Sequence, residues 1–131
     1  MQEIYDEKET LTIVILPVTV DDLEEIYKIE LECFGEEAYP KSIFSYFLIT
    51  PGSIFLKALK ENQIIGFIAG VCRSGICTLY TLNVKKDFRR KGIGSMLLEA
   101  FEIEALKRNV EKIILQVEVT NFPALNLYLK R

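Results

Sequence analysis

The spacing of hydrophobic positions changes several times along the chain, and each change predicts a new element. A β-branched run at residues 11–16, ended by a proline, predicts a first strand. Residues 20–33 then carry hydrophobic side chains at helical spacing. Thr19 lies just before them and Asp22 follows three residues later, which is the spacing of a capping box. Residues 40–50 predict a second helix, which a Pro-Gly pair ends. The chain is therefore expected to begin with one strand and two short helices.

From residue 53 the hydrophobic period falls to two, which is typical of strands. Runs at residues 53–60, 64–73 and 77–84 are separated by the turn signals Glu-Asn and Ser-Gly, and they predict an antiparallel meander. Gly66 and Gly70 lie inside the second of these strands. Glycine in that position indicates a bulge or a close neighbour.

The spacing becomes helical again at residues 92–108, and a further strand follows at 112–119. Asn121 is expected to cap a last helix, with Pro123 in its first turn. The element order is βααβββαβα, and a right-handed crossover makes strand 77–84 parallel to the strand at 112–119. The predicted fold is α/β (α+β): a mixed, mostly antiparallel sheet with helices on both faces.

Length and composition limit the class of protein. With 131 residues, 50% of them hydrophobic and 27% charged, the chain suits one globular domain, residues 1–131, of which residues 1–10 are expected to be flexible. A net charge of −3 argues against a nucleic-acid-binding protein. No apolar run approaches the roughly 20 residues of a membrane span, and the acidic N-terminus does not resemble a signal peptide. We expect a cytoplasmic protein with no membrane or nucleic-acid partner.

The residue types that supply most metal and nucleophile chemistry are scarce. The sequence has no histidine, which removes the usual imidazole base and the commonest metal ligand. Cys33, Cys72 and Cys77 lack the spacing of a zinc site or a disulfide framework, so neither a metal nor a disulfide is expected. Cys72 and Cys77 flank a predicted hairpin turn, where they are expected to face one another as small core residues. Chemistry must come from carboxylates, tyrosines, backbone groups or a cofactor.

The turn after strand 77–84 is the strongest candidate for a binding site. Its arginine and lysine side chains are positive, its glycines let the backbone pass close to a ligand, and its N–H groups converge at a helix N-terminus, where the dipole favours an anion. It lacks the ending of a P-loop and the first glycine of a dinucleotide fingerprint. We interpret it as a pyrophosphate cradle; the alternative is a solvated basic turn whose glycines pack a helix on a sheet. Its residues are Arg89, Arg90, Lys91, Gly92, Ile93, Gly94 and Ser95.

Three blocks of sequence agree with one known family: the Leu-Asn-Val strand end with its basic turn, residues 115–121, and residues 124–128. Together they resemble the GNAT superfamily of N-acetyltransferases, and within it the RimI-like enzymes that acetylate ribosomal-protein alanine and other protein N-termini. The signature of those enzymes ends in Asn-x-x-Ala-x-x-Leu-Tyr, and the resemblance extends from residue 11 to the last residue. It implies direct transfer of the acetyl group of acetyl-CoA to a primary amine, here the N-terminal α-amine of a protein such as a ribosomal protein.

The resemblance also implies how acetyl-CoA is held. The basic turn would bind the pyrophosphate, and the backbone of the strand end would pair with the pantetheine arm, provided that strands 77–84 and 112–119 splay apart. The N–H of Val84 would polarise the thioester carbonyl. Asn121 would hydrogen-bond the pantetheine, in addition to capping its helix. The strand-end residues are Leu82, Asn83 and Val84.

Catalytic roles follow from the same resemblance, with one departure. Tyr128 would be the general acid that protonates the departing thiolate; by itself, it reads as an aromatic residue on a core-facing helix. Relatives place a glutamate base where this chain has Gln116, which cannot accept the proton of the attacking amine. Glu118 lies two residues further on the same strand face and is our substitute candidate, the alternative being an ordinary solvated carboxylate.

Acidic and aromatic residues between the first two helices are candidates for the acceptor pocket. Glu36 and Glu37 would attract an ammonium-bearing acceptor, and Tyr39 would pack on its first residue. The family normally continues from the Tyr128 helix into two further strands, which we expect to be missing here. An apolar edge at 112–119 would then be open, so we expect a homodimer through this edge or a compromised enzyme. Alternative functions are a small-molecule amine acetyltransferase and a CoA-binding module with little turnover.

Overall fold

The computed structural model describes residues 12–116 of the chain. The strands are β1 (Val14–Pro17), β2 (Ser53–Lys60), β3 (Gln63–Arg73), β4 (Ile76–Val84) and β5 (Lys112–Leu115). The α-helices are α2 (Leu23–Phe34), α3 (Lys41–Ile49) and α4 (Ile93–Lys107), and the short 3₁₀ turns are η1 (Val20–Asp22), η2 (Gly35–Glu37) and η3 (Lys86–Phe88).

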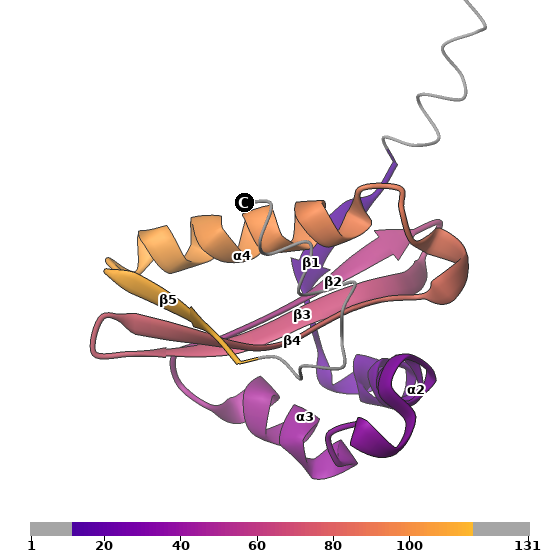
Figure 1. The fold of residues 1–131 in the computed structure, drawn as a ribbon, viewed down its shortest axis with the longest axis horizontal. Coiled ribbons are helices and arrows are strands. Elements are labelled where there is room, and N and C mark those ends of the chain that lie inside the picture. The colour runs from indigo at the N-terminus through magenta and orange to yellow at the C-terminus, as the bar shows by residue number, and fades with distance from the viewer. Residues whose placement is uncertain (1–11, 117–131) are drawn as a thin grey trace, which may run out of the picture.

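β1 to β5 form one mixed sheet in which the strand order is the chain order. The first four strands are antiparallel neighbours, whereas β5 pairs parallel to β4 after the crossover through α4. α4 covers one face of the sheet, and α2 and α3 cover the other (Figure 1). The predicted mixed, mostly antiparallel sheet with helices on both faces is therefore confirmed. Residues 117–119 and the helix expected from Asn121 lie outside the described residues.

Two element boundaries differ from the prediction. The first helix is preceded by the separate turn η1, because the N–H of Thr19 donates to the Asp22 carboxylate at 2.7 Å and tightens the entry of the chain. β1 starts at Val14 and includes Pro17. An edge strand tolerates proline because one side of its backbone needs no partner strand.

Each face of the sheet has its own hydrophobic core. Under α4, the side chains of Leu97 and Phe101 are fully buried. Under α2 and α3, aromatic rings pack edge to face, as for Phe44 and Phe67, whose centroids lie 5.7 Å apart at 89°. With both faces covered, β3 is buried along almost its whole length. A ligand can therefore reach the sheet at its edges and strand ends.

The glycines inside β3 sit beside bulges, as predicted. The pairing of β2 with β3 shifts next to Gly66, and the pairing of β3 with β4 shifts next to Gly70, so that Tyr80 of β4 has no partner in the register. A Cβ atom at Gly70 would lie 2.7 Å from the ring of Phe101 and 2.5 Å from the carbonyl oxygen of Thr78. Glycine at this position lets α4 pack closely on the sheet.

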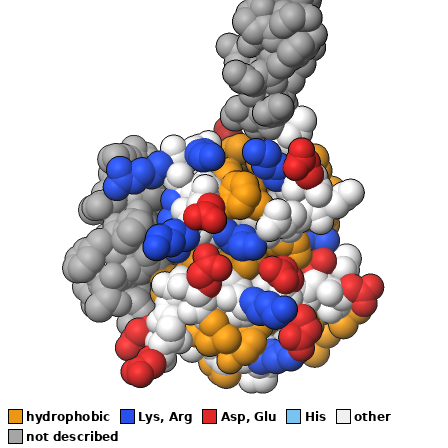
Figure 2. Space-filling model, turned by 90° about the vertical axis from the view of Figure 1, so that its right-hand side faces the viewer, with side chains coloured by type: hydrophobic (Ala, Val, Ile, Leu, Met, Phe, Trp, Pro, Cys, Tyr) orange, Lys and Arg blue, Asp and Glu red, His pale blue; other side chains and the backbone are white. Residues whose placement is uncertain are grey.

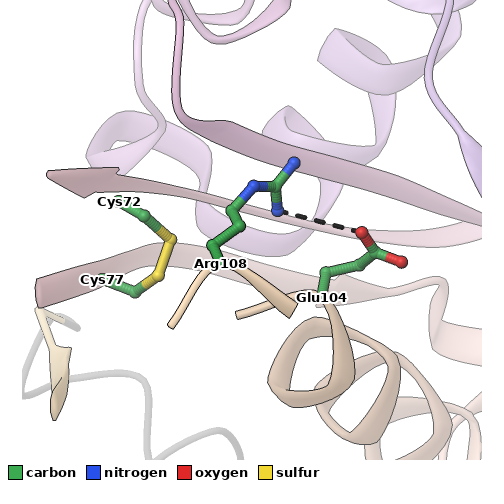
Figure 3. The surroundings of a disulfide bond; sticks show 4 residues. All are labelled: Cys72, Cys77, Glu104 and Arg108. Atoms are coloured by element: carbon green, nitrogen blue, oxygen red, sulfur yellow. Dashed lines mark ion pairs between the residues drawn. A yellow bond between two sulfur atoms is a disulfide. The ribbon is translucent and has the colours of Figure 1, made fainter. Parts of the chain in front are cut away.

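Cys72 and Cys77 form a disulfide bond, so the prediction of no disulfide was wrong (Figure 3). The two residues are register partners across the β3–β4 hairpin, with Cα atoms 3.8 Å apart, which brings their side chains together on one face of the ribbon. The expectation that they face one another is confirmed. An ion pair between Glu104 and Arg108, with N and O 3.9 Å apart, lies close by at the end of α4.

The apolar side chains of β5 are partly exposed. Ile113, Ile114 and Leu115 keep 36%, 42% and 41% of their surface accessible. Association of two copies through this edge stays a prediction. Among residues 12–116, no helix is long and apolar enough to cross a membrane, and no group of three or more Cys, Asp or Glu side chains is arranged to hold a metal ion.

We expect the Gly70→Ala variant to lower the free energy of unfolding by about 1–3 kcal/mol, because the new methyl group overlaps the Phe101 ring and the Thr78 carbonyl. Urea unfolding measures the change. In a Phe101→Leu background, which lacks the ring edge, Gly70→Ala should lower the free energy of unfolding by less than it does in the wild type. A Gly70→Ala variant as stable as the wild type would contradict the close packing.

The disulfide predicts how many cysteines react with iodoacetamide in denaturant. Protein purified without reductant should gain one adduct, at Cys33, and three after reduction. The Cys72→Ala variant is the control and should gain two adducts without reductant, since its partner is then free. Three adducts on the unreduced wild type, by intact mass, would show that the pair is not oxidised.

Candidate functional site

β4 runs on beyond the last described residue of its parallel partner, and we call the side of residues 80–84 that faces away from β3 the opening. The pairing with β5 reaches Leu79 and Leu115, and the N–H of Gln116 still donates to the Leu79 carbonyl at 3.0 Å. From residue 80 onwards, β4 has no neighbour on that side among the described residues. The bulge at Tyr80 lies one residue beyond the last described pair. The predicted splaying of the two strands concerns residues 117–119, which lie outside the described residues, so it stays a prediction.

The backbone at the open edge can be assigned from its alternation. The N–H of Lys85 donates to the Ile65 carbonyl of β3 at 2.8 Å. Because hydrogen-bonding groups alternate sides along a strand, the N–H groups of Leu82 and Val84 point away from β3, towards the opening. Among the described residues, neither of these two N–H groups has a partner strand on that side.

The basic turn follows directly and leads into α4. Gly92 has φ +84°, in the left-handed region, and a Cβ atom there would meet nothing within 4 Å, so the space above the turn is open. The N–H of Met96 donates to the Gly92 carbonyl at 3.0 Å. The N–H groups of Ile93, Gly94 and Ser95 have no backbone acceptor among the described residues, as is usual in a first helical turn. Their dipoles favour an anion.

The side chains of the turn do not all face the same way. Arg90, at φ +64°, and Lys91 are exposed, and the ammonium of Lys91 lies 5.9 Å from the centroid of the Phe88 ring. Arg89 instead folds back: its Nε donates to the Val84 carbonyl at 2.9 Å, and its Nη2 lies 3.3 Å from Cys33 Sγ. Arg89 therefore caps the end of β4, while Arg90 and Lys91 supply free positive charge to the turn.

Figure 2 looks onto the end of the molecule where α2 and this turn lie. Lys and Arg side chains alternate there with carboxylates and do not merge into one basic surface. Such a mixed face suits a ligand with a localised negative group better than a long polyanion.

Sequence reasoning missed a buried carboxylate beside the opening. Glu30 of α2 is 1% exposed and accepts hydrogen bonds from Asn83 Nδ2 (3.0 Å) and Thr81 Oγ1 (3.2 Å) of β4, and from the N–H of Tyr39 (3.0 Å). Burial raises the pKa of Glu30 above its usual value, although these hydrogen bonds oppose the shift. The available signal was a charged residue within the apolar face formed by Ile26 and Ile29.

Of the acceptor candidates between α2 and α3, Tyr39 lies close to β4, whereas Glu36 and Glu37 lie at the surface. The hydroxyl of Tyr39 donates to the Tyr80 carbonyl at 3.5 Å, so this residue meets the strand at its bulge. Glu36 and Glu37 in η2 are exposed, and no ion pair to them is found among residues 12–116. The structure thus brings Tyr39, Asn83 and the basic turn to one end of the sheet.

The remaining candidates are those of the C-terminal segment. Gln116 is exposed directly after β5, and its backbone N–H donates to the Leu79 carbonyl of β4. Glu118, Asn121 and Tyr128 lie outside the described residues, so their roles stay predictions.

The end of β4, the basic turn and the N-terminus of α4 follow one another directly, which is an arrangement suited to an anionic ligand. The family model described as "Acetyltransferase (GNAT) family" matches residues 21–131. The chain belongs to this family of acetyltransferases. The predicted fold and the predicted enzyme class are thereby confirmed.

Individual relatives agree with this membership. The chain is 32% identical over 125 aligned residues to an N-alpha-acetyltransferase of Saccharolobus solfataricus, covering 85% of this chain and 74% of the relative. The crystal structure of the ribosomal-protein-S18-alanine N-acetyltransferase from Escherichia coli superposes with a TM-score of 0.81 at 24% identity, covering 90% of this chain and 75% of that one. The structure of PaiA N-acetyltransferase from Thermoplasma acidophilum, solved in complex with coenzyme A, superposes with a TM-score of 0.76 at 22% identity. The match covers 90% of this chain and 87% of that one. The predicted resemblance to RimI-like enzymes is confirmed.

The pKa of Glu30 predicts a pH dependence of stability. The pKa of Glu30 is higher in the folded state than the reference value of 4.5. The stabilising contribution of Glu30 is therefore complete below pH 4.5 and is lost as the pH rises through the folded-state pKa. The free energy of unfolding of the wild type, minus that of Glu30→Gln, should therefore fall as the pH rises from about 4 to about 7. Denaturant unfolding at several pH values measures this difference.

Asp22 supplies the control of opposite sign. Burial favours its neutral form, but hydrogen bonds from Lys57 and Thr19 together leave its pKa below the usual value. The advantage of the wild type over Asp22→Asn should be present above the reference pKa and disappear as the pH falls. A difference for Glu30→Gln that is flat, or that grows with pH, would contradict the raised pKa.

Proposed function

We propose that this chain transfers the acetyl group of acetyl-CoA to a primary amine, the N-terminal α-amine of a protein. The observation that carries the proposal is that the N–H groups of Leu82 and Val84 face away from β3, a short turn before the first turn of α4. An extended ligand with a terminal pyrophosphate matches this combination of strand-edge donors and an anion site.

The described residues suit the pyrophosphate and part of the pantetheine arm of acetyl-CoA. The open space over Gly92, the first-turn N–H groups of α4, and the charges of Arg90 and Lys91 suit the pyrophosphate. The edge at Leu82 suits the amide groups of the pantetheine arm. Asn121 is the further proposed pantetheine contact. When bound, acetyl-CoA supplies an acetyl thioester, an activated acyl donor.

Val84 is well suited to polarise the thioester carbonyl. Its own carbonyl is already engaged by Arg89 Nε at 2.9 Å and lies 3.6 Å from Cys33 Sγ, whereas its N–H points into the opening. The residue therefore offers a ligand a donor without a competing free acceptor, as an oxyanion requires. Arg89 thus contributes to the site by capping Val84, a role different from direct phosphate binding.

Proton transfer needs a base and an acid. Gln116 carries no proton-accepting carboxylate, so we retain Glu118 as the proposed base and Tyr128 as the proposed donor to the departing thiolate. The pKa of a free thiol, near 8.5, makes thiolate a fair leaving group, so a phenol suffices as the acid. Glu36 and Glu37 are proposed to draw an ammonium group towards the opening.

The choice of a protein α-amine rests on the relatives. One is named an N-alpha-acetyltransferase, and a structural neighbour is the ribosomal-protein-S18-alanine N-acetyltransferase. A small-molecule amine and a binding module with little turnover are the alternative outcomes of the following experiment.

Calorimetric titration with acetyl-CoA, followed by thiol release with peptides, tests the proposal. We expect saturable binding, thiol release with free N-terminal peptides, and none with the same peptides N-acetylated. Arg90→Glu should weaken acetyl-CoA binding at least about tenfold, since it reverses a charge at the anion site. Lys107→Glu, at the other end of α4, is the charge-matched control and should bind like the wild type.

Three results would contradict parts of the proposal. Absence of acetyl-CoA binding would reduce the family membership to a statement about the fold. Binding without thiol release would favour the binding module. Release with small amines but with no peptide would replace the protein acceptor by a small-molecule one.

A further inference from the structure

We infer that Glu30 is a positioning residue that holds the acceptor-side elbow, residues 35–40, against the strand that presents the acetyl group. The inference rests on the proposed function and assigns a role in that site to a residue that lies outside the motifs of the sequence. It starts from one carboxylate that joins three elements: α2, which carries it, β4, and the elbow.

The contacts of Glu30 divide between its two oxygens. Oε1 accepts hydrogen bonds from Thr81 Oγ1 at 3.2 Å and Asn83 Nδ2 at 3.0 Å, both on β4. Oε2 accepts one from the backbone N–H of Tyr39 at 3.0 Å. One oxygen therefore serves the strand and the other serves the elbow, so the position of each depends on the same side chain.

The strand residues joined in this way border the proposed acyl site. Thr81 and Asn83 alternate with Leu82 and Val84, whose N–H groups face the opening. Asn83 Nδ2 also donates to Thr81 Oγ1 at 2.9 Å, which makes the two side chains and the carboxylate a closed set. Movement of this set would displace the Val84 donor together with the elbow.

The arrangement is unfavourable as a purely stabilising device. A buried carboxylate loses its hydration, and replacing such a group by an apolar side chain of similar size is often neutral or stabilising. In addition, Asn83 Oδ1 is buried and has no hydrogen-bond partner among the described residues, which is unfavourable for stability. A cluster that does not maximise stability is better explained by the geometry that it imposes.

Neighbouring contacts show that the same end of α2 is attached to the end of β4. Cys33 Sγ lies 3.6 Å from the Val84 carbonyl, and the Glu32 carboxylate accepts the N–H of Lys86 at 3.1 Å. These bonds hold the helix, but they do not reach the elbow. Glu30 does so through Tyr39, whose hydroxyl also meets the Tyr80 carbonyl at 3.5 Å.

Two substitutions separate geometry from stability. Glu30→Met fills a similar volume without accepting a hydrogen bond, so it should keep the fold and release the elbow. Glu30→Gln keeps an oxygen for the Tyr39 N–H, and rotation of the Asn83 amide lets its Oδ1 accept from the new NH₂ group. Glu25→Met is the matched control, because Glu25 lies half-buried on the same helix and its carboxylate pairs with Lys85 and not with the elbow.

Amide hydrogen exchange measures how firmly the elbow is held and does not require enzyme activity. In Glu30→Met, with or without acetyl-CoA, the amide of Tyr39 should exchange at least about tenfold faster, while the amides of β3 stay protected. Glu30→Gln and Glu25→Met should stay within about threefold of the wild type. Unchanged exchange at Tyr39 in Glu30→Met would overturn the inference, whatever the activity.

Steady-state kinetics then test the role in transfer. For Glu30→Met we expect KM for the acceptor peptide to rise and kcat to fall, each by about tenfold, with the Kd for acetyl-CoA unchanged and Glu30→Gln restoring most of the loss. A drop in kcat alone, matched by a smaller folded fraction, would reduce Glu30 to a structural residue and overturn the inference. If the wild type releases no thiol with any amine, the proposed function fails and the positioning role with it, while the exchange data still report the tie itself.

Discussion

The direction of the backbone N–H groups at the end of β4 is the constraint on which the rest of the site depends. Hydrogen-bonding groups alternate sides along a strand, so the N–H groups of Leu82 and Val84 face away from β3. Within the described residues, the pairing of β4 with β5 reaches Leu79 and Leu115. Because α4 begins a short turn later, a strand edge and a helix N-terminus are brought to the same place. Neither feature alone would select a long ligand that carries phosphate.

The two faces of the sheet have different tasks around this opening. Under α4, Gly70 and Phe101 let the helix approach closely, which fixes where its first turn and the basic turn lie. On the other face, the buried Glu30 joins α2, the elbow and β4 through directional bonds, where the surrounding phenylalanines supply only non-directional packing. A hydrophobic core tolerates small shifts more readily than a hydrogen-bonded cluster does, so the polar cluster sets the finer geometry.

The order of elements, the mixed sheet and the bulges could be predicted because they follow from local periodicity and from glycine in strands. The Cys72–Cys77 disulfide was missed because spacing rules describe cysteine frameworks, whereas this bond depends on the register of a single hairpin. Glu30 was missed because its position fits the helical stripe and nothing local reveals that Thr81 and Asn83 meet it. Arg89 was grouped with Arg90 and Lys91 because sequence gives a turn its charge but not the direction of each side chain.

The central claim is that the open edge of β4 and the first turn of α4 together hold the coenzyme. A titration of the ¹⁵N-labelled chain with coenzyme A, followed by backbone amide NMR, tests this most directly. The account predicts saturable shifts concentrated at the amides of Leu82, Val84 and the residues that follow Gly92, with β1 and β2 unperturbed. Saturable shifts confined to other parts of the molecule, or none at millimolar coenzyme A, would contradict it.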